Sequence, residues 1–175
     1  LLTETNTSPD VDALRLRRMA NNYATLLRSR RFMGYALSLS FAFAGVFSFV
    51  TGSPFVMIEL LSITPDVFAI WFAFVAGGYM VGSFTSTRLV PRLGIDRTIA
   101  LGTTIYISCA LILIWVAMIG HFDAWAICAP MIVISFGNGM VIPNCQAGSL
   151  SPFPKMAGAA AALMGCFSMI GAGLG

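Results

Sequence analysis

Charged residues are scarce in this chain of 175 residues. Only 10% of the residues are Asp, Glu, Lys or Arg and 58% are hydrophobic, whereas soluble domains carry about 25% charged residues. So few charges cannot form a water-facing surface, which excludes a soluble enzyme. The net charge of +3 also provides no broad basic patch for nucleic acid. We therefore predict that lipid surrounds most of the chain and that nucleic acid is not a partner.

Residues suited to catalysis or metal binding are also sparse. Enzymes bring together acids, histidines or an activated nucleophile, but the single histidine, His121, lies in a short turn beside Asp123. The cysteines are isolated from one another and lack metal-ligand spacing. They are Cys109, Cys128, Cys145 and Cys166. We therefore predict no enzymatic activity, no cofactor and no metal site.

Long apolar runs without charges make up most of the remaining sequence. A helix needs about 20 mostly apolar residues to cross the hydrocarbon core of a bilayer. The runs are too uniformly apolar for barrel strands, in which polar and apolar residues alternate. The sequence therefore predicts an all-α polytopic membrane protein with five transmembrane helices. The predicted spans lie near residues 33–52, 67–88, 99–119, 124–146 and 157–175.

The positive charges occupy alternate connections between the predicted spans. Six arginines precede the first span, three lie between the second and third, and Lys155 lies between the fourth and fifth. The other two connections contain acidic residues but neither Lys nor Arg. Because positive residues collect on the cytoplasmic side, we predict a cytoplasmic N-terminus. Residues 1–31 would form a cytoplasmic segment, and residues 32–175 the transmembrane domain.

The cytoplasmic segment contains the pattern of a short amphipathic helix. Ser8 and Pro9 are typical of a helix start. A loose apolar stripe opposite the arginines then includes Val11, Leu14, Tyr23, Leu26 and Leu27. This pattern predicts a helix lying on the cytoplasmic membrane face. The alternative is that the arginines only orient the first span.

Glycine and proline indicate where helices pack closely or bend. Gly78 and Gly82 are four residues apart, a spacing that lets membrane helices approach one another. Pro130 and Pro143 each remove a backbone hydrogen bond from the fourth span and favour a kink. We predict a kink or gate at these prolines and at the adjacent Asn144.

Aromatic residues and one asparagine are the candidate lining of a substrate cavity. Deformable apolar side chains suit varied lipophilic ligands, and the candidates are Phe43, Phe47, Phe72 and Phe167. Asn138 lies between two glycines at membrane depth, where the backbone can approach a neighbour or a substrate. The alternatives are lipid contact or packing for the phenylalanines, and helix–helix hydrogen bonding for Asn138.

The connection between the second and third spans resembles a family signature. Residues 82–97 read GSFTSTRLVPRLGIDR, which is similar to the Gly- and Arg-rich cytoplasmic loop of the major facilitator superfamily. Arg92 and Gly94 match the Arg and Gly of its Asp-Arg-x-Gly-Arg-Arg core, whereas Pro91 replaces the acid and two basic positions hold Ile and Asp. The resemblance implies a cytoplasmic gating loop that includes Gly82, Arg88, Arg92 and Gly94.

Two further stretches extend the resemblance along most of the chain. They are SPFV at residues 53–56 and PNCQA at residues 143–147, the latter followed by AGAAAALMG at residues 157–165. Together these features resemble the second half of a Bcr/CflA-type multidrug efflux transporter. The chain would then be a partial sequence that contains spans seven to eleven of twelve, five helices of a six-helix half-bundle.

The resemblance implies a secondary active transporter in the bacterial cytoplasmic (inner) membrane. Such a protein would export small lipophilic drugs by proton antiport with alternating access, using protons as the coupling ion and a coupling acid in an N-terminal half. The implied partners are therefore a small-molecule substrate, protons and the lipid bilayer. Two alternatives stay open: a carrier of a sugar, amino acid or metabolite, and a non-transporting membrane scaffold subunit.

Overall fold

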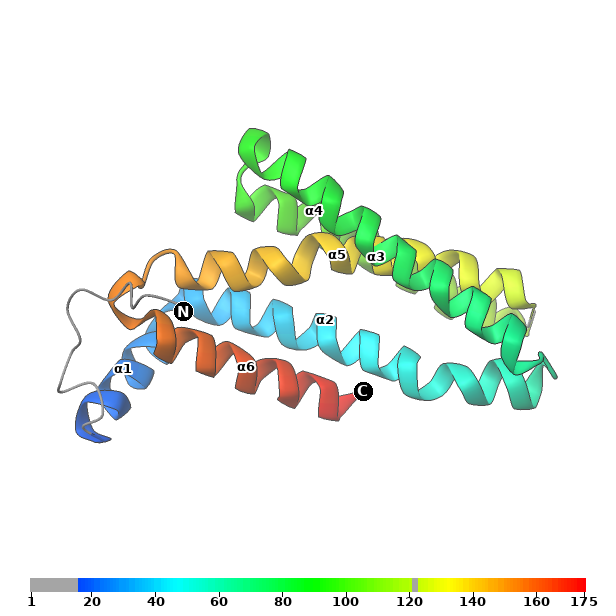
Figure 1. Cartoon of the computed structure of the whole chain (residues 1–175), viewed down its shortest axis with the longest axis horizontal. Helices are drawn as coiled ribbons and strands as arrows, with labels where there is room; N and C mark the ends of the chain where they lie inside the picture. Colours follow the sequence, from blue (N-terminus) through cyan, green and yellow to red (C-terminus); the bar gives the residue numbers. More distant parts are fainter. Residues whose placement is uncertain (1–15, 121–122) are drawn as a thin grey trace, which may run out of the picture.

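The computed structural model describes residues 16–120 and 123–175, and within these ranges every regular element is helical (Figure 1). The α-helices are α1 (Leu16–Arg28), α2 (Arg30–Pro54), α3 (Pro65–Leu93), α4 (Ile95–Ile119), α5 (Ala124–Leu150) and α6 (Ala157–Leu174). A π-helical segment, Phe55–Leu60, continues α2, and a 3₁₀ turn, Pro154–Met156, precedes α6.

Five of these helices are long and apolar enough to cross a membrane. This confirms the predicted all-α polytopic class. The first of them runs without interruption over Arg30–Leu60, eight residues beyond the predicted end at residue 52. Pro54 cannot donate a backbone hydrogen bond, and the chain continues past it as the π-helical segment instead of ending there.

Helix α1 is attached to the bundle through its last turn. The side chain of Leu26 is fully buried among residues of α2, α5 and α6, whereas Leu27 is exposed. The Ser29 hydroxyl then accepts a hydrogen bond from the Phe32 backbone N–H and caps the start of α2. The predicted helix start at Ser8 and Pro9 lies outside the described residues.

Helix α5 lies at the centre of the bundle. It packs against α3 and α4 on one side and against α2 on the other, while α6 packs mainly against α2 (Figure 1). About 44% of the most apolar part of α5 is buried, compared with 11–22% for the other four long helices. Helix α5 is therefore the most buried of the five long helices.

Glycines bring α3 and α5 into backbone contact. A Cβ atom on Gly78 would lie 2.5 Å from the Ile132 carbonyl oxygen, and one on Gly82 would meet the Phe136 carbonyl. From the other side, a Cβ on Gly139 would meet the Tyr79 carbonyl. Since a carbonyl oxygen belongs to the rigid helix backbone, only glycine fits these positions at the present helix separation.

A single residue connects α3 to α4. Gly94 has φ 84° and ψ 164°, and helix precedes and follows it directly. The structure thus differs from the predicted gating loop, because Gly82, Arg88 and Arg92 lie within α3. The hydroxyls of Thr85 and Thr87 donate to carbonyls of the preceding helical turn, so these polar side chains are satisfied within the helix.

Candidate functional site

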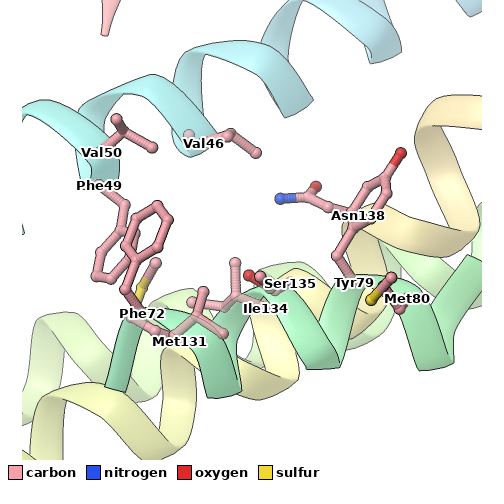
Figure 2. A pocket seen from close by; sticks show the side chains of 13 residues that line it. Val46, Phe49, Val50, Phe72, Tyr79, Met80, Met131, Ile134, Ser135 and Asn138 are labelled. Carbon is pink, nitrogen blue, oxygen red and sulfur yellow. The ribbon is translucent and has the colours of Figure 1, made fainter. Parts of the chain in front are cut away.

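A cavity of about 360 Å³ lies between α2, α3 and α5 (Figure 2). Its volume falls within the range of small-molecule sites, and all of its lining side chains are uncharged. Helix α2 contributes Val46, Phe49 and Val50; α3 contributes Phe72, Val75, Tyr79 and Met80; and α5 contributes Met131, Ile134, Ser135 and Asn138.

Two glycines determine which way Asn138 points. Successive residues of a helix are rotated by about 100°. Gly137 contacts Gly102 and Tyr106 of α4, and Gly139 contacts Tyr79 and Ser83 of α3. Asn138, halfway between these two directions, therefore faces α2, and Figure 2 shows its amide directed into the cavity.

The Asn138 amide is buried without a partner. The residue is only 2% exposed, and its Nδ2 atom has no hydrogen-bond acceptor among residues 16–120 and 123–175. Burial of an unpaired amide donor is unfavourable, because the group loses its hydrogen bonds to water. The cavity thus contains an unused hydrogen-bond donor in a mostly apolar lining, in which the other polar side chains are the hydroxyl-bearing Tyr79 and Ser135.

Two stacked rings form the opposite wall. Phe49 of α2 and Phe72 of α3 lie almost parallel, with an interplanar angle of 7° and ring centroids 6.4 Å apart. Figure 2 shows this pair at one end of the cavity and Asn138 at the other. The cavity therefore has an aromatic end and an amide end.

A second cavity, of about 580 Å³, lies on the other side of α2, between α2, α4 and α5. It shares Gly45 and Asn138 with the first cavity, and its lining is also uncharged. The Tyr106 hydroxyl packs directly against Gly45. Asn138 thus lies between two cavities, but only the first contains the stacked aromatic wall.

The structure brings together two of the five predicted cavity residues, Phe72 and Asn138. Phe43 and Phe47 instead stack on each other along α2, with centroids 6.3 Å apart. Phe43 and Phe167 pack against the core between α2 and α6. The reason is rotational, since Val46, Phe49 and Val50 occupy the face of α2 that turns toward α3.

The sequence did not single out Phe49 from the other aromatic residues of the spans, and Tyr79 was not predicted as a lining residue. Aromatic content alone does not separate them from the many other rings in the spans. The position of Tyr79 directly after Gly78 is one sequence feature that indicates a lining residue. A residue next to a helix-contact glycine lies at the edge of that contact, where a cavity between helices can form.

The arginines of the predicted loop lie at the end of the bundle where α3 ends and α4 begins. The Arg88 guanidinium lies over the Phe84 ring, 4.6 Å from its centroid, in a cation–π contact. Arg92 occupies the last turn of α3, where a positive charge is favourable next to free carbonyls. Arg88 thus has an aromatic partner on its own helix, and Arg92 is placed where the helix dipole favours it.

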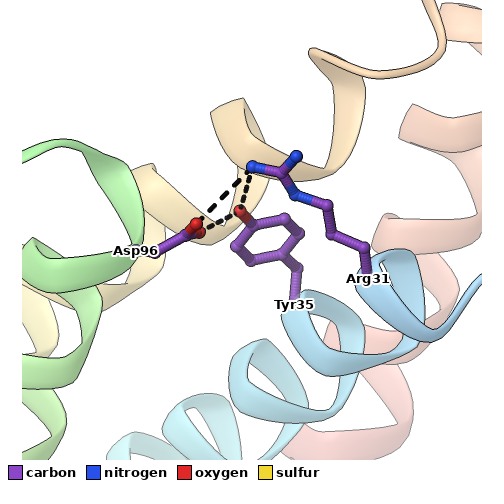
Figure 3. Close-up of polar contacts among 3 residues, drawn as sticks. All are labelled: Arg31, Tyr35 and Asp96. Atoms are coloured by element: carbon purple, nitrogen blue, oxygen red, sulfur yellow. Dashed lines mark hydrogen bonds and ion pairs between the residues drawn. The ribbon is translucent and has the colours of Figure 1, made fainter.

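A polar cluster that was not predicted links α2 to α4 at this same end (Figure 3). The Tyr35 hydroxyl donates to Asp96 Oδ1. Arg31 Nη2 donates to the Tyr35 hydroxyl at 3.5 Å and lies 3.5 Å from Asp96 Oδ2. The Arg31 and Asp96 side chains are 64% and 68% exposed, so their ion pair contributes at most about 1 kcal/mol.

The prolines and asparagine predicted as a kink or gate all lie in α5, which is helical from Ala124 to Leu150 without a break. Asn144 is buried, and its Nδ2 donates both to the Ser86 hydroxyl of α3, at 2.5 Å, and to the Met140 carbonyl, at 2.6 Å. Asn144 therefore acts as a hydrogen-bonded contact between α3 and α5.

We expect Ser86→Ala to lower the free energy of unfolding by about 0.5–1.5 kcal/mol. The substitution removes the interhelical acceptor of Asn144 but leaves the Met140 carbonyl as a second one. Thr85→Ala is the control, because the exposed Thr85 hydroxyl bonds only within α3. Thermal unfolding of the purified full-length protein in detergent measures both variants. Equal midpoints for the two would show that the Asn144–Ser86 bond contributes nothing.

Comparison with known proteins agrees with this architecture. The family described as Major Facilitator Superfamily matches residues 3–175. "Bicyclomycin resistance protein homolog" of Haemophilus influenzae is 27% identical and "Multidrug resistance protein D" of Escherichia coli is 30% identical, each over 94% of this chain and 41% of the relative. "Multidrug transporter MdfA" of Edwardsiella piscicida is 26% identical over 90% of this chain and 38% of the relative. The chain thus spans about two fifths of the length of these curated relatives. No solved structure matches it significantly.

Proposed function

Because the chain belongs to the major facilitator superfamily, we propose that it contributes spans seven to eleven to a transporter that exports small lipophilic drugs. It is a multi-pass membrane protein of a transporter family, and the resemblance to Bcr/CflA-type multidrug transporters is confirmed by its relatives. The names of those relatives refer to bicyclomycin resistance and multidrug resistance.

The observation that carries the proposal is the uncharged cavity between α2, α3 and α5. It has the volume of a drug-sized site, an apolar lining and one free amide donor. A polar nutrient such as a sugar needs several inward hydrogen-bonding groups, and this lining supplies few. The cavity therefore favours a lipophilic drug over a sugar or amino acid as the substrate.

We further propose proton antiport by alternating access in the bacterial inner membrane, with the N-terminus of this chain in the cytoplasm. Within the described residues, acidic side chains lie only near helix ends. The coupling acid would then belong to the remainder of the full-length transporter. Paired bundles rocking about a midplane site are the common design of such carriers. The connection between α3 and α4 at Arg92 and Gly94, together with Gly82 and Arg88 of α3, would contact the helix bundle of the N-terminal half on the cytoplasmic side.

The proposal predicts active export by the full-length transporter. When it is produced in bacteria that lack their main efflux pumps, we expect lower accumulation of radiolabelled chloramphenicol. A protonophore should restore accumulation to the level of cells without the transporter. Equal accumulation with and without the protein would contradict drug export. Export that continues in the presence of the protonophore would contradict only the proton coupling and not the export itself.

The cavity assignment predicts a specific loss in the same assay. Phe72→Ala removes half of the stacked wall, and we expect export of chloramphenicol at limiting concentration to fall about threefold to tenfold. Phe74→Ala is the matched control, because Phe74 lies on the same helix, is 59% exposed and does not line this cavity. Equal losses in both variants, at equal protein levels, would argue against the cavity as the transport site.

A further inference from the structure

The two buried asparagines of α5 differ in how their amides are used. Asn144 Nδ2 donates to Ser86 and to the Met140 carbonyl. Asn138 Nδ2, nearly two turns earlier on the same helix, has no acceptor in the part of the chain that the structure describes, although the residue is 98% buried. Asn144 therefore has a packing role, whereas the Asn138 donor is available to a molecule inside the cavity.

The rest of the lining restricts what that molecule can be. None of the side chains of this chain that line the cavity is charged, so they offer an ionised carboxylate or ammonium no opposite charge in return for its lost hydration. An apolar molecule without polar atoms would leave the amide unpaired. A neutral ligand with one hydrogen-bond acceptor satisfies both conditions.

The distance along the cavity restricts the shape of the ligand. Phe72 lies at the aromatic end, and Tyr79, seven residues later on α3, lies beside Asn138 at the amide end (Figure 2). Seven residues of helix span about 10 Å. A flat aromatic ligand can therefore touch the Phe49–Phe72 pair with one ring while an acceptor elsewhere on it reaches Asn138.

We propose that Asn138 makes this cavity specific for neutral, flat aromatic compounds that carry a carbonyl acceptor, such as aryl ketones and aryl amides. The Asn138 Nδ2–H donates to the ligand carbonyl, and the stacked rings of Phe49 and Phe72 hold its apolar end. This inference deepens the proposed drug export and rests on it.

The test compares two ligands that differ in one group. In 9-fluorenone a carbonyl replaces the methylene of fluorene, and the tricyclic body is otherwise the same. Equilibrium binding of each radiolabelled compound to the purified full-length transporter in one detergent gives the ratio of the two affinities. For a neutral hydrogen bond, we expect the wild type to bind fluorenone about 3- to 10-fold more tightly than fluorene.

Substitutions at Asn138 should remove this preference. We expect equal binding of the two ligands by Asn138→Leu and by Asn138→Ala, because neither side chain has a hydrogen-bond donor. Asn144→Leu is the matched control on the same helix, because its amide does not line the cavity, and we expect it to keep the wild-type ratio. Melting curves identify any variant that does not fold. If one Asn138 variant does not fold, the ligand preference of the other provides the test.

Two outcomes would overturn the inference. Either the wild type shows no preference for fluorenone, or the Asn138 variants keep the wild-type preference. Competition by tetraphenylphosphonium as strong as that by fluorenone would also overturn the restriction to neutral ligands. Since chloramphenicol export is measured separately in cells, drug export can hold while this inference fails.

Discussion

Gly82→Ala is expected to destabilise the bundle by about 2–3 kcal/mol, even though alanine favours a helix more than glycine does. The Cβ atom would meet the carbonyl oxygen, carbonyl carbon and Cα of Phe136 on α5. These are backbone atoms, so no side-chain rotation can relieve the collision. The two helices would have to separate, which loosens the contacts on both sides of Gly82.

The neighbouring glycine provides the control for Gly82→Ala. Gly77 lies in the same helix, and no heavy atom lies within 4 Å of the position that its Cβ would occupy. Gly77→Ala should therefore leave stability unchanged or raise it by up to about 1 kcal/mol through helix propensity. Thermal unfolding of the purified full-length protein in detergent compares the two. A Gly82 variant as stable as the Gly77 variant would refute the backbone contact between α3 and α5.

Gly94→Ala is expected to destabilise the α3–α4 joint by about 1–3 kcal/mol for a different reason. No heavy atom lies within 4 Å of a Cβ at this position, so space is not limiting. The backbone itself, at φ 84° and ψ 164°, lies in a region that is essentially restricted to glycine. Gly94→Asn should destabilise the joint as much as Gly94→Ala does, because asparagine tolerates the left-handed helical region but not this ψ value.

The turn after α4 provides a matched comparison for Gly94. Gly120 has φ 75° and ψ 18°, within the left-handed helical region, and among the described residues beyond its own backbone and chain neighbours no heavy atom lies within 4 Å of a Cβ there. We therefore expect Gly120→Asn to cost less than about 1 kcal/mol, whereas Gly94→Asn costs as much as Gly94→Ala. The same melting assay ranks the three variants. Similar losses for asparagine at both glycines would show that backbone conformation is not the cause.

The class of fold follows from the sequence because bilayer thickness sets a length that few soluble segments match. The extent of α3 did not follow in the same way. The predicted span ends near residue 88, whereas α3 continues to Leu93 through Pro91 and Arg92, which have the composition of a loop. The hydroxyls of Thr85 and Thr87 bond to carbonyls of their own helix, and composition alone does not reveal this.

The candidate site was predicted only in part, because the sequence does not show how each helix is rotated about its own axis. Asn138 could be singled out because polar residues are rare at this depth and glycines flank it. The phenylalanines could not be sorted, because a span that is apolar all round has no stripe to show which face turns inward. Phe43 and Phe49 look alike in sequence, and only the packing of α2 against its neighbours separates them.

The central position of α5 also affects how the protein assembles during synthesis. Because the chain is made from its N-terminus, α3 and α4 enter the membrane before α5 exists, and the glycine surfaces at Gly82 and Gly102 first face lipid. Once α5 has been inserted, both α3 and α4 can pack against it. We therefore expect bulky substitutions at these glycines to spare insertion but to leave a chain that quality-control proteases remove before it matures.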